Sequence, residues 1–278
     1  MPIRQETLEC HKRAIGAVIE VARKDPSAPL DLTAMAAIAS MGECHFLRVF
    51  EEVTSVSPVR FLAALRIERA KHLLLETSLS VTTICFEVGY NSLGTFTRLF
   101  TEYVGLCPGS FRRLHEELLR SPIDGMIAKY LRRQPPLCLQ CAIAGSVTGP
   151  TGFQGVIFLG LFPSTMPRGW PVAGSLLPRQ GRFELAGPGN STPSCLMAAG
   201  FPADSTVTQY LLPSPNELLV DAVSLPRQFS QSPPQTIDLT LRPLGAFDPP
   251  ILIALPSLLR EDPYGDSQFP RSVGAAHA

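Results

Sequence analysis

The sequence reads FLRVFEEVTSVSPVRF at residues 46–61 and FTRLFTEYVGLCPGSF at residues 96–111. At an offset of 50 residues, six positions are identical in the two stretches. They are Phe46/Phe96, Arg48/Arg98, Phe50/Phe100, Glu52/Glu102, Pro58/Pro108 and Phe61/Phe111. Just upstream the offset becomes 49, which pairs Met35-Ala36 with Ile84-Cys85 and predicts a turn one residue longer in the second copy. The chain therefore contains an internal repeat of one structural unit.

Each copy predicts two short helices around a tight turn. The first helix opens at a capping residue, Thr33 in the first copy and Thr82 or Thr83 in the second. The turn falls at Ser40-Met41-Gly42 or at Gly89-Tyr90-Asn91. The second helix carries two phenylalanines four residues apart, which share one face and predict its buried side. The repeat therefore predicts a helix-turn-helix that is present twice.

A longer helix is predicted between the copies, over residues 59–76, with an apolar side of leucines and alanines. Its 18 residues span about 27 Å at the helical rise. Successive major-groove faces of B-DNA lie roughly 34 Å apart. Two recognition helices held on one rigid helix would read adjacent turns of one duplex face, as a dimer of single modules does.

The second copy carries most of the motif residues by which the chain resembles a known family. These are Ile84-Cys85, Gly89-Tyr90-Asn91-Ser92, Phe96-Thr97-Arg98-Leu99-Phe100, Gly105, Pro108 and Phe111-Arg112. Together with linker residues from Pro58 to Leu74, they make residues 10–115 resemble the DNA-binding domain of the AraC/XylS family of bacterial transcriptional regulators. The resemblance implies binding of double-stranded DNA and contact with RNA polymerase.

The resemblance also implies which side chains face DNA, because the second helix of each copy lies in the major groove in this family. By position, the reading faces are Glu43, Cys44, His45, Leu47 and Arg48, and then Asn91, Ser92, Leu93, Gly94, Thr95, Thr97 and Arg98. Arginine pairs with guanine in a bidentate geometry, and threonine bonds a base edge or a phosphate. At the rim, Arg112-Arg113 and Lys12-Arg13 are expected to contact phosphates.

Structural roles stay open for several of these residues. Arg48 and Arg98 each have a glutamate four residues on, Glu52 and Glu102, with which they would form salt bridges. His45 suits a DNA contact and a packing role about equally. The phenylalanines of both second helices are expected in the core.

Three features depart from the family pattern. Ser40 replaces the usual glycine of the first turn, and Gly42 stands where a capping serine is more common. Leu93 and Gly94 stand where polar base readers are typical. Residues 1–120 hold 14 basic and 14 acidic residues, so we expect weak nonspecific DNA binding that depends on a local patch.

Proline divides the chain of 278 residues, because residues 1–120 hold only five of the 27 prolines and can be mostly helical. We predict an α + β chain of two domains: an all-α domain at residues 1–120 and an all-β sandwich or small barrel at residues 137–278, ending in a flexible tail. A connector at residues 121–136 contains a short amphipathic helix over Ile123–Arg133. The predicted strands are residues 137–144, 156–162, 172–177, 182–185, 195–199, 217–225, 236–241 and 251–255.

The C-terminal domain is predicted to sense an effector or bind a partner, which the sequence does not identify. Catalysis is not expected, because the domain has no histidine before His277 and no paired-carboxylate motif. No cofactor and no metal site is predicted, although the pair Cys138 and Cys141 is a weak sign of metal or redox sensing. Trp170 and the phenylalanines around it either line an apolar pocket or pack in the core.

Composition narrows the class of protein. The chain is 45% hydrophobic, which is enough to bury a core. It has no net charge, so it lacks the overall positive potential that would attract a membrane or a nucleic acid. No apolar run is long enough to span a membrane and no signal-peptide core is present, which predicts a cytoplasmic protein without a membrane partner. The sequence predicts a DNA-binding transcriptional regulator that is not an enzyme. The alternative is a protein-interaction or scaffold protein whose helix-turn-helix domain reads DNA weakly, and either a monomer or a homodimer is compatible with the sequence.

Overall fold

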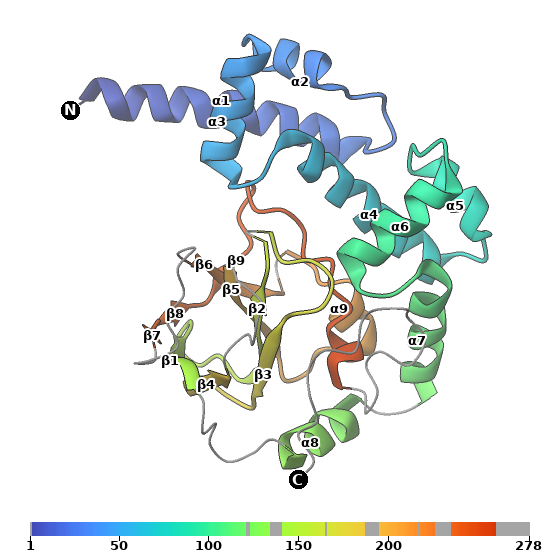
Figure 1. Cartoon of the computed structure of the whole chain (residues 1–278), viewed down its shortest axis with the longest axis vertical. Helices are drawn as coiled ribbons and strands as arrows, with labels where there is room; N and C mark the ends of the chain where they lie inside the picture. The colour runs from blue at the N-terminus through green and yellow to red at the C-terminus, as the bar shows by residue number, and fades with distance from the viewer. Residues whose placement is uncertain are drawn as a thin grey trace. The chain divides into compact units, whose positions relative to one another are not determined.

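The computed structural model describes residues 2–120, 123–133, 141–164, 166–186, 195–215, 217–225 and 235–259 (Figure 1). The chain divides into two compact units. The helical unit comprises Met1–Arg112 and Leu244–Ile253, and the β-rich unit comprises Arg113–Pro243 and Ala254–Ala278. In the part of the chain that is described, no helix has the length and apolar character needed to cross a membrane.

The helical unit is built on six helices and the start of a seventh. They are α1 (Pro2–Lys24), α2 (Leu32–Ile38), α3 (Glu43–Thr54), α4 (Pro58–Glu76), α5 (Val81–Glu87), α6 (Leu93–Val104) and α7 (Pro108–Arg120). The predicted long helix is confirmed as α4, which starts one residue earlier because Pro58 suits the first helical position. It is buried on most sides by residues from Phe61 to Leu74, so it forms the centre of the unit.

The predicted repeat appears in the backbone hydrogen bonds of two helix pairs, α2–α3 and α5–α6. In the first turn the amides of Ser40 and Met41 donate to the carbonyls of Ala37 and Ala36, each at 3.0 Å. In the second turn Gly89 and Tyr90 make the same two bonds to Phe86 and Cys85, again at 3.0 Å. The connection between the paired helices is one residue longer in the second copy, as the change of offset predicts.

Aromatic side chains repeat in the same way. The ring centroids of Phe46 and Phe50 lie 5.5 Å apart, and Phe61 continues the row at 5.6 Å. In the second copy Phe96, Phe100 and Phe111 form the equivalent row, with both spacings 5.8 Å. All six rings are buried, which confirms the predicted core position of the four phenylalanines of α3 and α6.

The predicted capping threonines are wrong, because both first helices begin earlier. The carboxylate of Asp31 accepts from the amide of Ala34 at 2.8 Å, and the hydroxyl of Ser80 accepts from the amide of Thr83 at 3.0 Å. Thr33 and Thr83 therefore lie inside the first turn of their helices. A residue in the first turn offers its backbone amide to the capping side chain and does not act as the N-cap.

A segment from the C-terminal part of the chain belongs to the helical unit, and we call residues 244–253 the strap. Leu252 and Ile253 are buried there, and the ring of Phe247 lies against Gly16 of α1. The predicted strand over residues 251–255 is wrong, since the carbonyl of Leu252 accepts a hydrogen bond from a lysine side chain rather than from a neighbouring strand. In Figure 1 the strap is the orange-red trace that follows β9 (Arg242–Pro243).

The described strands of the β-rich unit form two sheets. In one, β1 (Cys141–Thr148) pairs with β4 (Gly181–Ala186), β7 (Gln235–Thr236) and β8 (Leu239–Thr240). The other has the order β3 (Ala173–Leu177), β2 (Gly155–Phe162), β5 (Cys195–Pro202), β6 (Leu219–Ser224), β9. Side chains from both sheets share one hydrophobic cluster, as in a sandwich.

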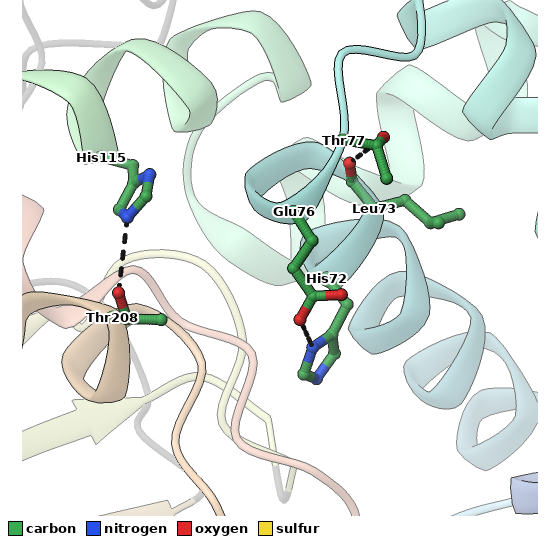
Figure 2. Close-up of polar contacts among 6 residues, drawn as sticks. All are labelled: His72, Leu73, Glu76, Thr77, His115 and Thr208. Carbon is green, nitrogen blue, oxygen red and sulfur yellow. Dashed lines mark hydrogen bonds and ion pairs between the residues drawn. The ribbon is translucent and has the colours of Figure 1, made fainter.

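The β-rich unit is not all-β. The predicted helix over Ile123–Arg133 is confirmed as α8, inside the predicted connector, and two further elements were not predicted. They are the 3₁₀ helix η1 (Leu255–Leu259) and α9 (Val207–Leu211), which Thr206 starts with a capping box. The hydroxyl of Thr208 in α9 lies 3.5 Å from Nε2 of His115 in α7 (Figure 2), and burial lowers the pKa of that histidine.

Candidate nucleic-acid interface

The first predicted reading face lies at the start of α3. Glu43, Cys44, His45 and Arg48 are exposed and Leu47 is half-buried. The opposite face of α3 carries Phe46, Val49 and Phe50 into the core, so its exposed side is fixed by the packing. Gly42 is the N-cap and contributes no side-chain bond, which leaves the first amides of α3 free of a side-chain cap.

The second predicted reading face lies at the start of α6. Asn91, Ser92, Leu93, Gly94, Thr95 and Arg98 are exposed, and Thr97 is half-buried. Here the N-cap does supply a bond, because the hydroxyl of Ser92 accepts from the amide of Thr95 at 3.4 Å. Both faces therefore project from the N-terminal half of a helix whose position is fixed by an aromatic row.

The two arginines of the reading faces have different partners. Nη1 of Arg98 lies 3.4 Å from Oε2 of Glu102, the predicted i,i+4 salt bridge, with the side chains 68% and 36% exposed. Arg48 instead contacts Nδ1 of His45 at 3.1 Å, and the ring of His45 packs edge-on against His11 of α1 at 5.4 Å. Exposed ion pairs contribute little stability, so the contact between Arg98 and Glu102 is easily broken.

Arg112 lies in a different setting from the other predicted DNA contacts. It is half-buried, and its guanidinium donates to the carbonyls of Leu74, Thr77 and Leu79 at 2.9, 3.4 and 2.8 Å. The same helix end is closed by the hydroxyl of Thr77, which donates to the carbonyl of Leu73 at 2.6 Å (Figure 2). The positive guanidinium therefore stabilises the carbonyl end of α4 and fixes the segment that leads to α5.

Arg66 is a positioning residue that the sequence prediction missed. Its guanidinium donates to the carbonyls of Pro26 and Ala28 at 2.8 and 3.0 Å, which holds the loop between α1 and α2. That loop lies against the second turn, because a Cβ on Gly89 would approach the carbonyl oxygen of Ser27 to 2.7 Å. The motif glycine marks the turn, but only the structure shows which segment packs against it.

A cleft of about 590 Å³ opens elsewhere on the helical unit, lined by residues of α1, α4, α5 and the loop after α1. Cations (Arg23, Lys24, Arg69) and the carboxylate of Glu68 line it together, and Nδ1 of His72 contacts Oε1 of Glu76 at 2.9 Å at its wall (Figure 2). Burial raises the pKa of Glu68. The mixed charges give the cleft no single sign that would select an anion or a cation.

The residues proposed for metal or redox sensing are only partly described. Cys138 lies outside the described residues, and Cys141 begins β1. Among the described residues, no three His, Cys, Asp or Glu side chains gather closely enough to hold a metal ion. Of the aromatic residues proposed for a pocket, Phe158, Phe162 and Phe183 are buried, which supports the core-packing alternative for these three.

Comparison with known proteins places residues 35–114 in a family described as a helix-turn-helix domain. An uncharacterized HTH-type transcriptional regulator of Haemophilus influenzae is 33% identical over 102 residues, which are 37% of this chain and 34% of the relative. The RCS-specific HTH-type transcriptional activator RclR of Escherichia coli is 30% identical over 112 residues, 40% of this chain and 39% of the relative. The matched region thus spans little more than a third of the length of these relatives, which are named as regulators rather than enzymes.

Among solved structures, the DNA-binding domain of AdpA in complex with a target DNA is similar with a TM-score of 0.36 and 25% identity. The similarity covers 39% of this chain and 96% of that domain.

Proposed function

We propose that the chain regulates transcription by binding duplex DNA with α3 and α6. The match of residues 35–114 to a helix-turn-helix domain and the resemblance to the AraC/XylS family support the proposal. One observation carries the proposal. The two helix pairs share their turn hydrogen bonds and their aromatic rows, and each presents an exposed N-terminal face with an arginine at the equivalent position, Arg48 or Arg98. Two copies of a reading element on one central helix suit two successive major-groove faces.

In each reading face, side chains would recognise the sequence through base edges, and backbone amides would fix the position of the protein on the duplex through phosphates. Arg48 and Arg98 are placed for bidentate contacts to guanine, and Thr95 and Thr97 for base edges or phosphates. The uncapped amides at the start of α3 suit a phosphate oxygen. Arg112 would act differently from this set, by holding α4 and the segment before α5 in place through its three carbonyl contacts.

The β-rich unit would supply the signal, as a sensor for an effector or a partner, and contact with RNA polymerase would make the chain an activator. Both assignments follow from the family resemblance. A monomer already carries both reading helices, and a homodimer through the β-rich unit would bind paired sites.

A scaffold role is the second candidate, favoured by two observations. Residues 1–120 carry 14 basic and 14 acidic groups, and Leu93 and Gly94 place no polar side chain at two positions of the second face. A salt titration separates the candidates. A regulator keeps a large preference for one site as salt rises, whereas a chain without productive readout loses all its binding together.

The test is enrichment of genomic DNA fragments by the purified full chain near physiological salt, followed by sequencing. We expect a motif with two elements about one helical turn apart. Arg48→Ala and Arg98→Ala should each cost about 1–3 kcal/mol of binding free energy on that motif. Arg69→Ala removes an equal charge from an exposed position on α4 and should leave affinity unchanged. Unchanged affinity of the Arg48→Ala/Arg98→Ala double variant would rule out α3 and α6 as the reading helices.

A further inference from the structure

The strap leaves the β-rich unit and returns to it within ten residues, 244–253. Immediately before it, β9 pairs with β6 through Arg242 and Pro243. Immediately after it, η1 begins at Leu255, which is buried. Both ends of the strap are therefore anchored in the β-rich unit, while its middle is packed in the helical unit.

The strap makes one of its contacts with a cation of α4. Nζ of Lys71 donates to the carbonyl of Leu252 at 3.1 Å, and the lysine side chain is only 1% exposed. The same nitrogen lies 5.6 Å from the ring centroid of Phe111. A buried amine without a hydrogen-bond acceptor is costly, so the carbonyl of Leu252 is needed as long as Lys71 stays in the core.

A second contact joins the strap to a cation of α1. Nη2 of Arg23 donates to the carbonyl of Asp248 at 3.1 Å, and its guanidinium carbon lies 5.9 Å from the ring centroid of Phe61. Phe61 and Phe111 are equivalent positions of the repeat. The strap therefore contacts two cations, and each cation lies over the last ring of one of the two aromatic rows.

Each aromatic row leads from the strap to a reading helix. From Phe61 the row passes through Phe50 to Phe46 of α3, and from Phe111 it passes through Phe100 to Phe96 of α6. Both cations also act on one carboxylate of α4, because the charges of Arg23 and Lys71 oppose the burial that raises the pKa of Glu68. Seating or releasing the strap thus changes the surroundings of both rows at once.

We propose that the strap couples the β-rich unit to the reading helices, with strap-seated and strap-released forms that an effector or partner of the β-rich unit would bias. β9 and η1 flank the strap, so their conformations can differ between the two forms. A ligand that binds one of these conformations more tightly shifts the population toward the corresponding form. The inference rests on the proposed function for its effect on DNA, but the seating of the strap is a property of the chain alone.

Hydrogen–deuterium exchange of the full chain tests the seating. Phe247→Ala removes the half-buried ring against Gly16, and Leu252→Ala removes a buried side chain while keeping its carbonyl. We expect exchange of residues 15–23 and 62–74 to rise at least about fivefold, while β2 and β5 keep their protection. Ala246→Ser, an exposed position of the same strap, is the matched control and should change neither. Unchanged exchange in α1 and α4, or an equal rise in β2 and β5, would overturn the proposal.

A third variant isolates the hydrogen bond. Lys71→Met keeps the apolar stem of the side chain and removes the donor to Leu252. We expect exchange of residues 247–253 to rise at least about fivefold. If the strap keeps its protection in this variant, the lysine does not hold it.

The effect on DNA is measured on the fragment that the wild-type chain enriches most strongly. The dissociation constant of Phe247→Ala should differ from that of wild type at least about fivefold, with Ala246→Ser unchanged. An unchanged constant combined with raised exchange would overturn the coupling. If wild type enriches no fragment, the proposed function fails and with it the coupling to DNA, while the exchange experiment still decides whether the strap holds the helical unit.

Discussion

The two helix pairs of the helical unit share a backbone plan but differ in the residues that carry it. Each turn needs one residue with positive φ, which is Ser40 at 54° in the first pair and Gly89 at 84° in the second. Each second helix also needs an N-cap, which is Gly42 in the first pair and Ser92 in the second. Glycine and serine have therefore changed places between the copies.

The surroundings of each turn explain why the first copy tolerates serine at positive φ. Ser40 is exposed, whereas the second turn packs against the loop that carries Ser27. Left-handed backbone costs a residue with a Cβ about 1–2 kcal/mol, which a protein can sustain where space is open. At Gly89 the same conformation is combined with a close backbone neighbour, so only glycine fits.

The largest effect is expected from a substitution at the turn that requires glycine. Gly89→Ala should lower the free energy of unfolding by about 3 kcal/mol, because strain at φ +84° adds to the approach of the new Cβ to the carbonyl of Ser27. Urea denaturation followed by far-UV circular dichroism measures the change.

Ser40→Ala is the matched control at the equivalent turn. It keeps a Cβ at the same positive φ and should change stability by no more than about 0.5 kcal/mol. A loss of no more than about 1–2 kcal/mol in Gly89→Ala, the cost of the left-handed backbone alone, would show that conformation, and not the contact with Ser27, sets the requirement for glycine.

A second difference between the copies concerns Arg112, whose equivalent in the first copy is the buried Leu62. Arg112→Ala should cost about 2 kcal/mol of stability, because three carbonyls lose a charged donor. The same denaturation experiment measures it, with the exposed Arg48→Ala as the comparison variant. If Arg112→Ala weakens DNA binding without lowering stability, Arg112 is a phosphate contact as first predicted from the sequence.

The sequence predicted the repeated parts of the helical unit because periodic patterns encode them. The phenylalanine spacing placed the core, and the change of offset from 50 to 49 placed the longer turn. The N-caps Asp31 and Ser80 were missed because threonine is also a preferred N-cap residue and lies within three residues of each of them.

The strap could not be predicted, because its contacts join residues far apart in the chain. Lys71 and Leu252 are 181 residues apart, and a lysine in a helix ordinarily predicts an exposed side chain. Residues 251–255 are apolar enough to predict a strand. In the structure, however, the carbonyl of Leu252 accepts a hydrogen bond from the side chain of Lys71 rather than from a neighbouring strand. Arg66 and Arg112 likewise bind carbonyls, which no sequence pattern marks.

One of the two cations under the strap makes stability depend on pH. Burial lowers the pKa of Lys71 to about 7. Between pH 7 and the ordinary lysine range the unfolded chain binds more protons at this site than the folded chain, so stability rises with pH across that window. Between pH 7 and pH 8 the rise should be about 1 kcal/mol.

Lys71→Met tests that assignment in the same pH series. The variant should lose the rise above pH 7. A rise that persists in Lys71→Met would assign it to another group.

The smallest expected effect compares the two N-caps. Ser92→Ala removes the bond from the amide of Thr95 and should cost about 0.5–1 kcal/mol. Gly42→Ala has no side-chain bond to remove, and its extended backbone at φ −70° and ψ 147° suits alanine, so its cost should be less than half as large in the same denaturation series. Losses of equal size would mean that the cap bond of α6 adds nothing. A larger loss of stability at Ser92 with no change in DNA affinity would show that the cap of α6 serves the fold.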